Sequence, residues 1–274
     1  MKDLVSICIP LYNSEKYILE TLKSVTQQDY DKLEIVICDD CSSDSSFEKV
    51  KNFINSFGKS PIMFRLHENK TNLGMTENWN HVIEKAKGEY IKLMGGDDIL
   101  APNCISKQVK VLKELPEISL VTCKKRLINS SGRKLFAKGF PGAEDSYYGR
   151  EAAYKALNIG GSILGEPVTG LFRKKDFLQV SGYDPAIRYH ADMDLWIRLL
   201  LIGNYYYIKE PLISFRIHKA SATVQLKHET LEDFTRMFQK YQKEEGMQSL
   251  DLRKILKKVK IMTFLRSLVT RLLA

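Results

Sequence analysis

The sequence predicts an α/β protein built around a doubly wound, mixed sheet. Short β-branched apolar runs alternate with amphipathic helical patterns through the first hundred residues, as in βαβ units. Two of these runs are followed by pairs of aspartates, and doubly wound sheets bind ligands at the carboxyl ends of their strands. With 274 residues, 44% hydrophobic and 10% aromatic, the chain can bury a sizeable core.

Four strands and two helices are expected within the first hundred residues. Continuous apolar runs of this length are typical of strands that are buried on both faces of a parallel sheet. The helical patterns lie between the strands, and the second one ends at Gly88. The expected strands are residues 4–10, 33–38, 62–67 and 90–94, and the expected helices are residues 14–28 and 75–88.

The chain divides by pattern into a main domain, residues 1–222, and a C-terminal helical extension, residues 223–274. In the main domain, residues 1–100 carry the strand–helix alternation. Residues 101–222 mix helices with strands, such as those expected at 119–123 and 205–210, and include a glycine-rich loop at 158–167. Beyond residue 222, long polar–apolar helical patterns run to the end.

The sequence predicts a soluble or peripheral protein of the cytoplasm. Pro10, Asn13 and Glu15 interrupt the N-terminal segment before an apolar leader could form. The longest charge-free runs are too short and too polar to span a bilayer. Five scattered cysteines fit a reducing compartment better than a disulfide framework.

The positive charge of the chain is concentrated in its tail. Residues 250–274 hold seven basic side chains and one acid, and therefore carry +6 of the net charge of +9. The rest of the protein is nearly neutral, so we expect no nucleic-acid partner.

Apolar residues recur at helical spacing in this tail, with basic residues between them. A basic amphipathic helix is typical of contact with an anionic membrane surface, here the inner face of the cytoplasmic membrane. The same pattern also suits a helix that docks on the protein itself or in a homodimer. The apolar positions are Leu252, Ile255, Leu256, Val259, Met262, Leu265, Val269 and Leu272.

Two pairs of acids follow predicted strands. Asp39 and Asp40 follow one apolar run, and Asp97 and Asp98 follow another, so both pairs belong at the same edge of the sheet. Four carboxylates there would repel one another unless a positive charge lay near them. A divalent cation with a phosphate-bearing ligand would supply that charge. The alternative is that these acids only cap turns and helices.

Cys38 and Cys41 flank the first acid pair with the spacing of a zinc or redox motif. A zinc site needs four ligands, and the sequence has no second close cysteine or histidine pair. Two acids between the cysteines would disfavour a reactive thiolate. Cys38 is therefore interpreted as a small apolar residue that ends a strand.

A third acid cluster stands at the start of an apolar helical pattern. Asp192 and Asp194 are two residues apart, so on a helix they point in different directions. Asp192 could face a cleft, while Asp194 could pair with Arg198 one turn later. Alternatively, both are acids that favour a helix N-terminus. Glycine-rich dinucleotide and ATP loops are missing from the sequence, so a diphosphate would be held by a metal and scattered side chains.

In this order, the clusters resemble the family 2 glycosyltransferases, which have the GT-A fold. The resemblance covers about residues 4–222. It rests on "VSICIPLYNSEKYILETLKSV", "ICDDCSSD", "NLGMTENWN", "GEYIKLMGGDDIL", "GLFRKKDFLQVSGYDP", "ADMDLWIRL" and "FRIHKAS".

The resemblance implies a nucleotide site in residues 1–100 and an acceptor half in residues 101–222. Asp40 would accept the imide hydrogen bond of a pyrimidine base, with Asp39 supporting it. Asp97 and Asp98 would share contacts to the ribose and to Mn²⁺ or Mg²⁺, with Asp98 favoured as the metal ligand. The other implied residues are Pro10 and Tyr12, lining the nucleoside pocket, and Asn72 and Gly74, in a loop beside the nucleotide.

On the acceptor side, Asp192 matches the family's catalytic base. Trp196 and Arg198 match the helix that holds this base, with Asp194 as a further support. His218 matches a histidine near the diphosphate and its metal, although a lone histidine is as often structural.

Two positions depart from the family pattern. Gly95 replaces the first acid of the usual DxDD metal motif, and Ala191 replaces the glutamate that usually precedes the base. The second change predicts a different acceptor pocket, in which His190 could substitute for the lost glutamate.

The implied reaction is inverting transfer of a sugar from a UDP- or dTDP-linked donor to a hydroxyl of a glycan or lipid-linked acceptor, as in cell-surface polysaccharide synthesis. A sugar-phosphate nucleotidyltransferase is one alternative, but it would usually carry a glycine- and arginine-rich phosphate loop, which residues 9–17 lack. The other is a catalytically degenerate scaffold that binds nucleotide sugars, which Gly95 and Ala191 make conceivable.

Overall fold

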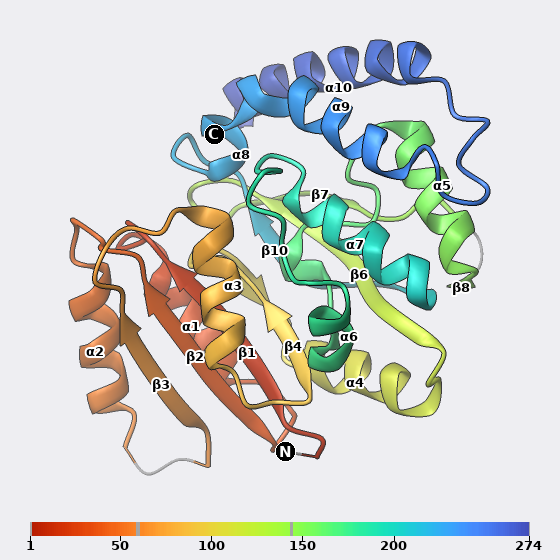
Figure 1. The fold of residues 1–274 in the computed structure, drawn as a ribbon. Helices are drawn as coiled ribbons and strands as arrows, with labels where there is room; N and C mark the ends of the chain where they lie inside the picture. The colour runs from red at the N-terminus through yellow and green to blue at the C-terminus, as the bar shows by residue number, and fades with distance from the viewer. Residues whose placement is uncertain (1, 59–60, 143–144, 274) are drawn as a thin grey trace.

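A computed structural model describes residues 2–58, 61–142 and 145–273 of the chain (Figure 1). Its first sheet has the strand order β3-β2-β1-β4-β9. The first four strands in sequence are parallel, and β9 runs antiparallel to β4. These strands are β1 (Val5–Leu11), β2 (Leu33–Asp39), β3 (Met63–Glu68), β4 (Tyr90–Leu93) and β9 (Phe172–Arg173).

Helices cover both faces of this sheet, as the uninterrupted apolar runs predict. Alternate residues of β1 point to opposite sides, so Ile7 packs in the same core cluster as α1, α2 and α4, and Cys8 in the same cluster as α3. In Figure 1, α3 lies in front of the sheet and α1 behind it. These helices are α1 (Ile18–Thr26), α2 (Ser46–Ser56), α3 (Met75–Lys85) and α4 (Cys104–Glu114).

A second sheet has the order β5-β10-β6-β7, with β8 also paired to β10. β6 and β10 are parallel, and a bridge between Val121 and Leu171 joins this sheet to the first one. Both strands extend beyond the runs expected at 119–123 and 205–210, because charged and proline residues interrupt their apolar pattern. The strands are β5 (Ile99–Leu100), β6 (Ile118–Ile128), β7 (Lys134–Lys138), β8 (Ser146–Tyr147) and β10 (Asn204–Arg216).

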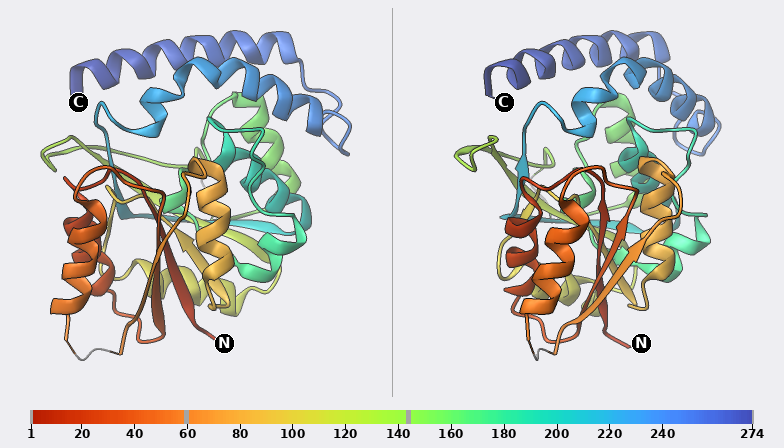
Figure 2. Two further views of the ribbon diagram at one scale, coloured as in Figure 1. Left: turned by 60° about the vertical axis from the view of Figure 1, so that its left-hand side comes forward. Right: turned by 90° about the vertical axis from the view of Figure 1, so that its left-hand side faces the viewer.

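Of the remaining helices, α5 and α7 pack on the second sheet, and α10 packs against α5 and α9. Figures 1 and 2 show the two longest C-terminal ones, α9 and α10, lying side by side on the outside of the molecule. The remaining helices of the described chain are α5 (Gly149–Ile159), η1 (Pro167–Thr169), α6 (Lys174–Gln179), α7 (Ala191–Ile202), α8 (Ala222–Gln225), η2 (Lys227–Glu229), α9 (Thr230–Tyr241) and α10 (Leu252–Leu273).

The C-terminal helices share a core with the rest of the protein. Phe234 and Met237 of α9, and Ile255 and Val259 of α10, are buried in the cluster that contains α5 and α7. Gly160 allows the close approach of α10, because a Cβ at this position would lie 2.7 Å from Val259. No helix within the described ranges is long and apolar enough to cross a membrane.

Candidate active site

The carboxyl ends of the parallel strands open into a cavity of about 590 Å³. Its wall combines the ends of β1, β2 and β4 with the start of α7 and the segment that follows β10. All three predicted acid segments therefore reach one cavity. Of the residues predicted from the sequence, those that line it are Pro10, Tyr12, Asp40, Asp97, Asp98, Asp192 and His218.

Asp40 holds the loop that follows β3. Its carboxylate accepts hydrogen bonds from the amides of Leu73 (2.7 Å) and Gly74 (2.9 Å) and from Nδ2 of Asn69 (2.9 Å). Asn72 donates to the Asp40 carbonyl at 2.8 Å. Gly74 has a φ of +83°, a conformation that favours glycine. Asn72 and Gly74 thus shape the cavity through Asp40 rather than by lining it.

Asp39 is buried beneath this wall. Its carboxylate accepts hydrogen bonds from the amide (2.9 Å) and the hydroxyl (2.6 Å) of Ser42, which fixes the turn after β2. Burial raises the pKa of the Cys38 thiol to about 12. The Cys41 thiol donates to the Asn69 carbonyl at 3.3 Å. Both cysteines therefore serve packing and loop contacts in this structure.

Asp97 and Asp98 have different surroundings at the end of β4. Nε2 of His218 lies 2.8 Å from the Asp97 carboxylate, whose side chain is 26% exposed. The Asp98 carboxylate is buried and accepts a hydrogen bond from the Arg216 amide at 3.1 Å. Burial, and then the neighbouring Asp97 charge, raise the pKa of Asp98 well above its usual value.

Arg216, which the sequence analysis missed, ties these acids to the first helix. Its side chain is buried, donates to the Asp97 carbonyl at 2.9 Å and pairs with Glu20 of α1 at 2.5 Å. The guanidinium also stacks over the ring of Tyr17, 4.5 Å from its centroid. The segment "FRIHKAS" marked this region, but a buried arginine at the end of a strand has no periodic signal of its own.

The side chains of Asp97, Asp98 and His218 offer ligand atoms that suit a hard divalent cation. Carboxylates and an imidazole are ligands that Mn²⁺ accepts, and a positive charge there would relieve the repulsion that raises the pKa of Asp98. A Cβ at Gly95 would lie 2.5 Å from the Asp97 carboxylate. The Asp97 side chain thus occupies space next to position 95, where the family pattern has an acid. No preformed group of three metal-binding side chains exists among the described residues.

Asp192 lies in the first turn of α7 and faces the cavity half-buried. Its carboxylate accepts hydrogen bonds from its neighbour's amide, Met193 N (2.7 Å), and from the Ser162 hydroxyl (3.2 Å). Burial, followed by the negative charge of Glu166, raises the pKa of Asp192 from 3.8 to about 6. A carboxylate with this pKa is a stronger base than an ordinary aspartate and is still largely ionised at pH 7.

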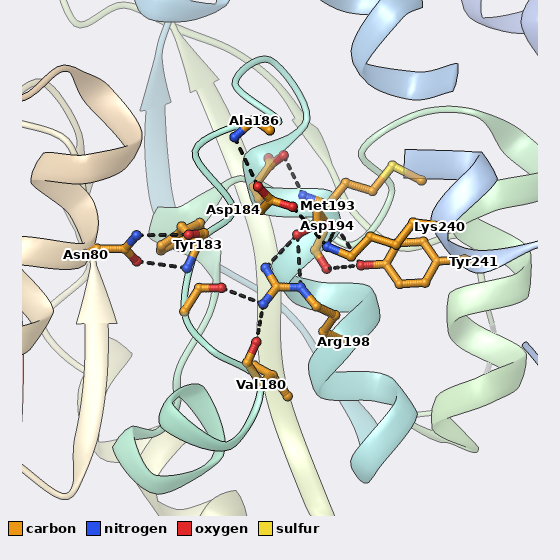
Figure 3. Close-up of polar contacts among 12 residues, drawn as sticks. Asn80, Val180, Tyr183, Asp184, Ala186, Met193, Asp194, Arg198, Lys240 and Tyr241 are labelled. Carbon is orange, nitrogen blue, oxygen red and sulfur yellow. Dashed lines mark hydrogen bonds and ion pairs between the residues drawn. The ribbon is translucent and has the colours of Figure 1, made fainter. Parts of the chain in front are cut away.

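Asp194 does not line the cavity and is buried in a network of polar contacts (Figure 3). As predicted, it pairs with Arg198, at 2.5 Å. It also accepts a hydrogen bond from the Tyr241 hydroxyl at 2.6 Å and pairs with Lys240 at 3.1 Å, both from α9. Arg198 in turn donates to the Val180 carbonyl. The network ties α7 to α9 and to the loop that precedes α7.

Trp196 and His190 complete the surroundings of α7 in different ways. Trp196 is buried and donates to the Gly165 carbonyl at 2.9 Å. The expectation that His190 enters the acceptor pocket is wrong. Its ring is buried against Phe234, 5.6 Å between centroids, and does not line the cavity, because α9 covers this side of the helix.

Glu166 is the carboxylate that lies near Asp192 instead. It lines the cavity and forms an ion pair with Lys125 of β6. Its only signal in the sequence is its place in the glycine-rich loop, which drew no functional interpretation.

Comparison with known proteins agrees with the family resemblance. The family described as "Glycosyl transferase family 2" matches residues 6–176. An uncharacterized glycosyltransferase of Rickettsia typhi is 31% identical over 222 residues, which cover 80% of this chain and 66% of that protein. The chain thus spans about two thirds of the length of this relative.

Two solved structures share the fold. TarS of S. aureus in complex with UDP-GlcNAc has a TM-score of 0.73 at 17% identity, covering 94% of this chain and 71% of that one. The mannosyltransferase PcManGT of Pyrobaculum calidifontis, in complex with GDP-Man and Mn²⁺, has a TM-score of 0.67 at 18% identity, covering 94% and 73%. The chain has the GT-A fold, and it belongs to glycosyl transferase family 2.

Proposed function

We propose that this protein is an inverting glycosyltransferase, which moves a sugar from a nucleotide-diphosphate donor to a hydroxyl of a glycan or lipid-linked acceptor. The observation that carries the proposal is that Asp40, Asp97 and Asp192, from three distant segments, line one cavity. TarS and PcManGT, which share the fold, were solved with UDP-GlcNAc and with GDP-Man. A UDP- or dTDP-linked donor is the form that we propose here.

The donor would lie across the ends of the first sheet. Pro10, Tyr12 and Asp40 would contact the nucleoside, and Asp97 would lie nearer the ribose and diphosphate. Asp97, Asp98 and His218 would hold a divalent cation, which when bound offsets the charge of the leaving diphosphate. Arg216 fixes Asp97 and Asp98 in place from behind.

In the transfer step, Asp192 takes the proton of the acceptor hydroxyl. The acceptor oxygen forms a bond to the anomeric carbon as the bond from that carbon to the diphosphate oxygen breaks, and the nucleoside diphosphate leaves with the bonding electron pair. A single displacement of this kind inverts the anomeric centre. General-base catalysis contributes about 10²–10⁴-fold to such a step.

Nucleoside diphosphate release from a panel of UDP-, dTDP- and GDP-sugars, with Mn²⁺ or Mg²⁺, would test the proposal. Binding of the correct donor should also raise the melting temperature by mass action. Stabilisation without any release by wild type would indicate a scaffold that binds nucleotide sugars. Pyrophosphate release from a nucleoside triphosphate and a sugar 1-phosphate would instead identify a nucleotidyltransferase.

We also infer that the outer face of α10 contacts an anionic membrane surface, which suits a lipid-linked acceptor. The inner face of α10 docks on the protein through Ile255 and Val259. On its outer face, large apolar side chains are exposed: Ile261 by 61%, Phe264 by 65% and Leu265 by 52%. The predicted positions Val269 and Leu272 lie outside the described side chains.

Charge complementarity favours a membrane over a protein partner for this face. The exposed apolar side chains come directly after four exposed lysines in the sequence of α10. The apolar side chains would insert into the membrane surface, and the lysines would be attracted to anionic headgroups. The lysines are Lys254, Lys257, Lys258 and Lys260.

Vesicle flotation of the full chain tests this surface. Wild type should float with vesicles of phosphatidylcholine and phosphatidylglycerol, and less with phosphatidylcholine alone or at high salt. The double variant Ile261→Ser, Phe264→Ser should lose this binding, whereas Leu178→Ser, equally exposed on α6, should keep it.

Equal recovery of both variants would refute the inference. Conversion of a dimer to a monomer by the double variant, measured by light scattering, would also refute it. Deleting the tail is a poorer test, because it removes Ile255 and Val259 from the core.

A further inference from the structure

The loop between α5 and β9 is attached rigidly to the helix that carries Asp192. Trp196 binds the Gly165 carbonyl, and Ser162 binds the Asp192 carboxylate. Gly165 has a φ of +102°, and a Cβ there would lie 2.2 Å from the Thr169 hydroxyl. The loop can therefore adopt this path only with glycine at position 165.

The loop places Glu166 on the cavity wall. The Glu166 carbonyl accepts hydrogen bonds from the amide (2.8 Å) and the hydroxyl (2.7 Å) of Thr169, which closes η1 behind it. The Glu166 carboxylate pairs with Lys125, whose side chain is only 7% exposed and does not line the main cavity. Glu166 thus faces the cavity, while Lys125 supports it from the sheet.

The charge of Glu166 affects two groups of the site. Glu166 lines the same cavity as both acids, and its charge adds to the larger effect of burial in raising the pKa of Asp98 at the donor end and of Asp192 at the acceptor end. Lys125 lowers the pKa of Asp192, as do the hydrogen bonds from Met193 and Ser162. Burial raises the pKa of the Tyr183 hydroxyl well above the usual value, so this group stays neutral and adds no charge to the surroundings of Asp192.

We propose that Glu166 is a positioning residue for the transfer: held by Lys125 and by the anchored loop, it sets a second carboxylate beside Asp192 and so controls how firmly Asp192 holds the acceptor's proton. The proposal rests on the proposed function for its role in turnover, but the electrostatic effect of Glu166 on Asp192 is a property of the free protein. It also explains how the site works with Ala191 where the family pattern has a glutamate, because the second carboxylate comes from another segment.

Carbon-13 NMR titration of the Asp192 carboxyl in the full chain tests the proposal without any substrate. The Asp192→Asn variant identifies the resonance. In Glu166→Gln the midpoint of the Asp192 titration should fall by at least about half a pH unit, because a negative charge is removed and Lys125 remains. In Lys125→Met it should rise. The control Glu210→Gln, which removes a carboxylate from the exposed pair with Lys107, should leave it unchanged.

If a single variant fails to fold, a double variant provides the same test. The double variant Lys125→Met, Glu166→Gln removes both charges of the ion pair together, a change that proteins often tolerate. Its midpoint should still lie below that of wild type, because the effect of Glu166 exceeds that of Lys125. A midpoint within about 0.2 units of wild type, in Glu166→Gln or in the double variant, would overturn the proposal.

Turnover provides a readout that a purely structural role would not change. In Glu166→Gln, the acid limb of the rate of nucleoside diphosphate release should move to lower pH, and the plateau rate should fall about threefold as the base weakens. Glu166→Asp should restore most of the wild-type profile. A change in the Asp192 titration midpoint without any measurable turnover would support the effect of Glu166 on Asp192 while counting against the proposed function.

Discussion

Nε2 of His218 lies 2.8 Å from the carboxylate of Asp97, although 121 residues separate them in the chain. The contact joins the segment after β10 to the segment after β4, and so connects the two sheets at the cavity. Asp98 lies behind it, buried and bonded to the Arg216 amide. Both acids line the cavity, but Asp97 is the more exposed of the two and so the more accessible to a ligand there.

Replacing Asp97 should therefore weaken cation-dependent binding of the donor. In Asp97→Asn, the increase in affinity for a nucleoside diphosphate on adding Mn²⁺ should fall about tenfold or more, because a neutral amide is a poor ligand. Affinity without the cation should change little. Isothermal titration calorimetry with and without Mn²⁺ measures both, and an unchanged response to Mn²⁺ would count against this site.

Replacing Asp192 should abolish most turnover while donor binding survives. In Asp192→Asn we expect kcat to fall about 10²–10⁴-fold, because the acceptor proton has no base to receive it. Steady-state kinetics, with donor affinity measured separately, checks this. If the variant kept more than about a tenth of the wild-type rate, the base would have to lie elsewhere.

The same substitution should stabilise the protein at neutral pH. The folded-state pKa of Asp192 is raised from 3.8 to about 6, so the folded protein binds this proton more tightly than the unfolded chain. Its contribution to stability is present below about pH 4 and is lost as the pH rises through 6, up to about 3 kcal/mol. Asp192→Asn should therefore match wild type near pH 4 and exceed it above pH 7.

Urea unfolding across this pH range measures the difference. Asp184→Asn is a control of opposite sign, because hydrogen bonds and Lys240 lower the pKa of Asp184 despite partial burial. That carboxylate stabilises the fold above its unfolded pKa and loses this effect as the pH falls. A wild-type minus Asp192→Asn difference that does not vary with pH would contradict the assignment.

Asp194 should matter for stability more than for chemistry. Asp194→Ala removes the buried carboxylate that Arg198 and Lys240 share and leaves the largely buried Arg198 without its ion-pair partner, and should lower the free energy of unfolding by about 3–5 kcal/mol. Glu232→Ala breaks an exposed pair with Arg236 on α9 and should cost less than about 1 kcal/mol. Similar urea midpoints for the two variants would argue against a structural role for the network.

Asp40 should control the loop at 69–74 as well as the nucleotide. In Asp40→Asn, an NH₂ group would meet the N–H of Leu73 or Gly74, and the clash of donors should cost about 1–3 kcal/mol. Hydrogen exchange should therefore become faster at the Leu73 and Gly74 amides, and nucleotide affinity should fall. Unchanged exchange at these amides would show that the loop is held by other contacts.

The sequence by itself determined the doubly wound domain and the acids at its strand ends. Buried parallel strands are short, continuous apolar runs, and the polar residue that follows each run lies at the ligand-binding edge. Asp40 and Asp97 could be placed for this reason, whereas Asp192 was predicted from the start of a helical pattern and from the family resemblance. The pairing of Asp194 with Arg198 could also be predicted, because helical spacing brings residues four apart together.

Only the tertiary structure decided which side chains complete the site. Glu166 reaches Asp192 because a glycine-rich loop folds against Trp196, and His190 is buried because α9 packs over it. Arg216 and His218 reach Asp97 because the end of β10 lies beside the segment that follows β4. These contacts depend on how distant elements pack, and local periodicity carries no information about partners that lie far away in the chain.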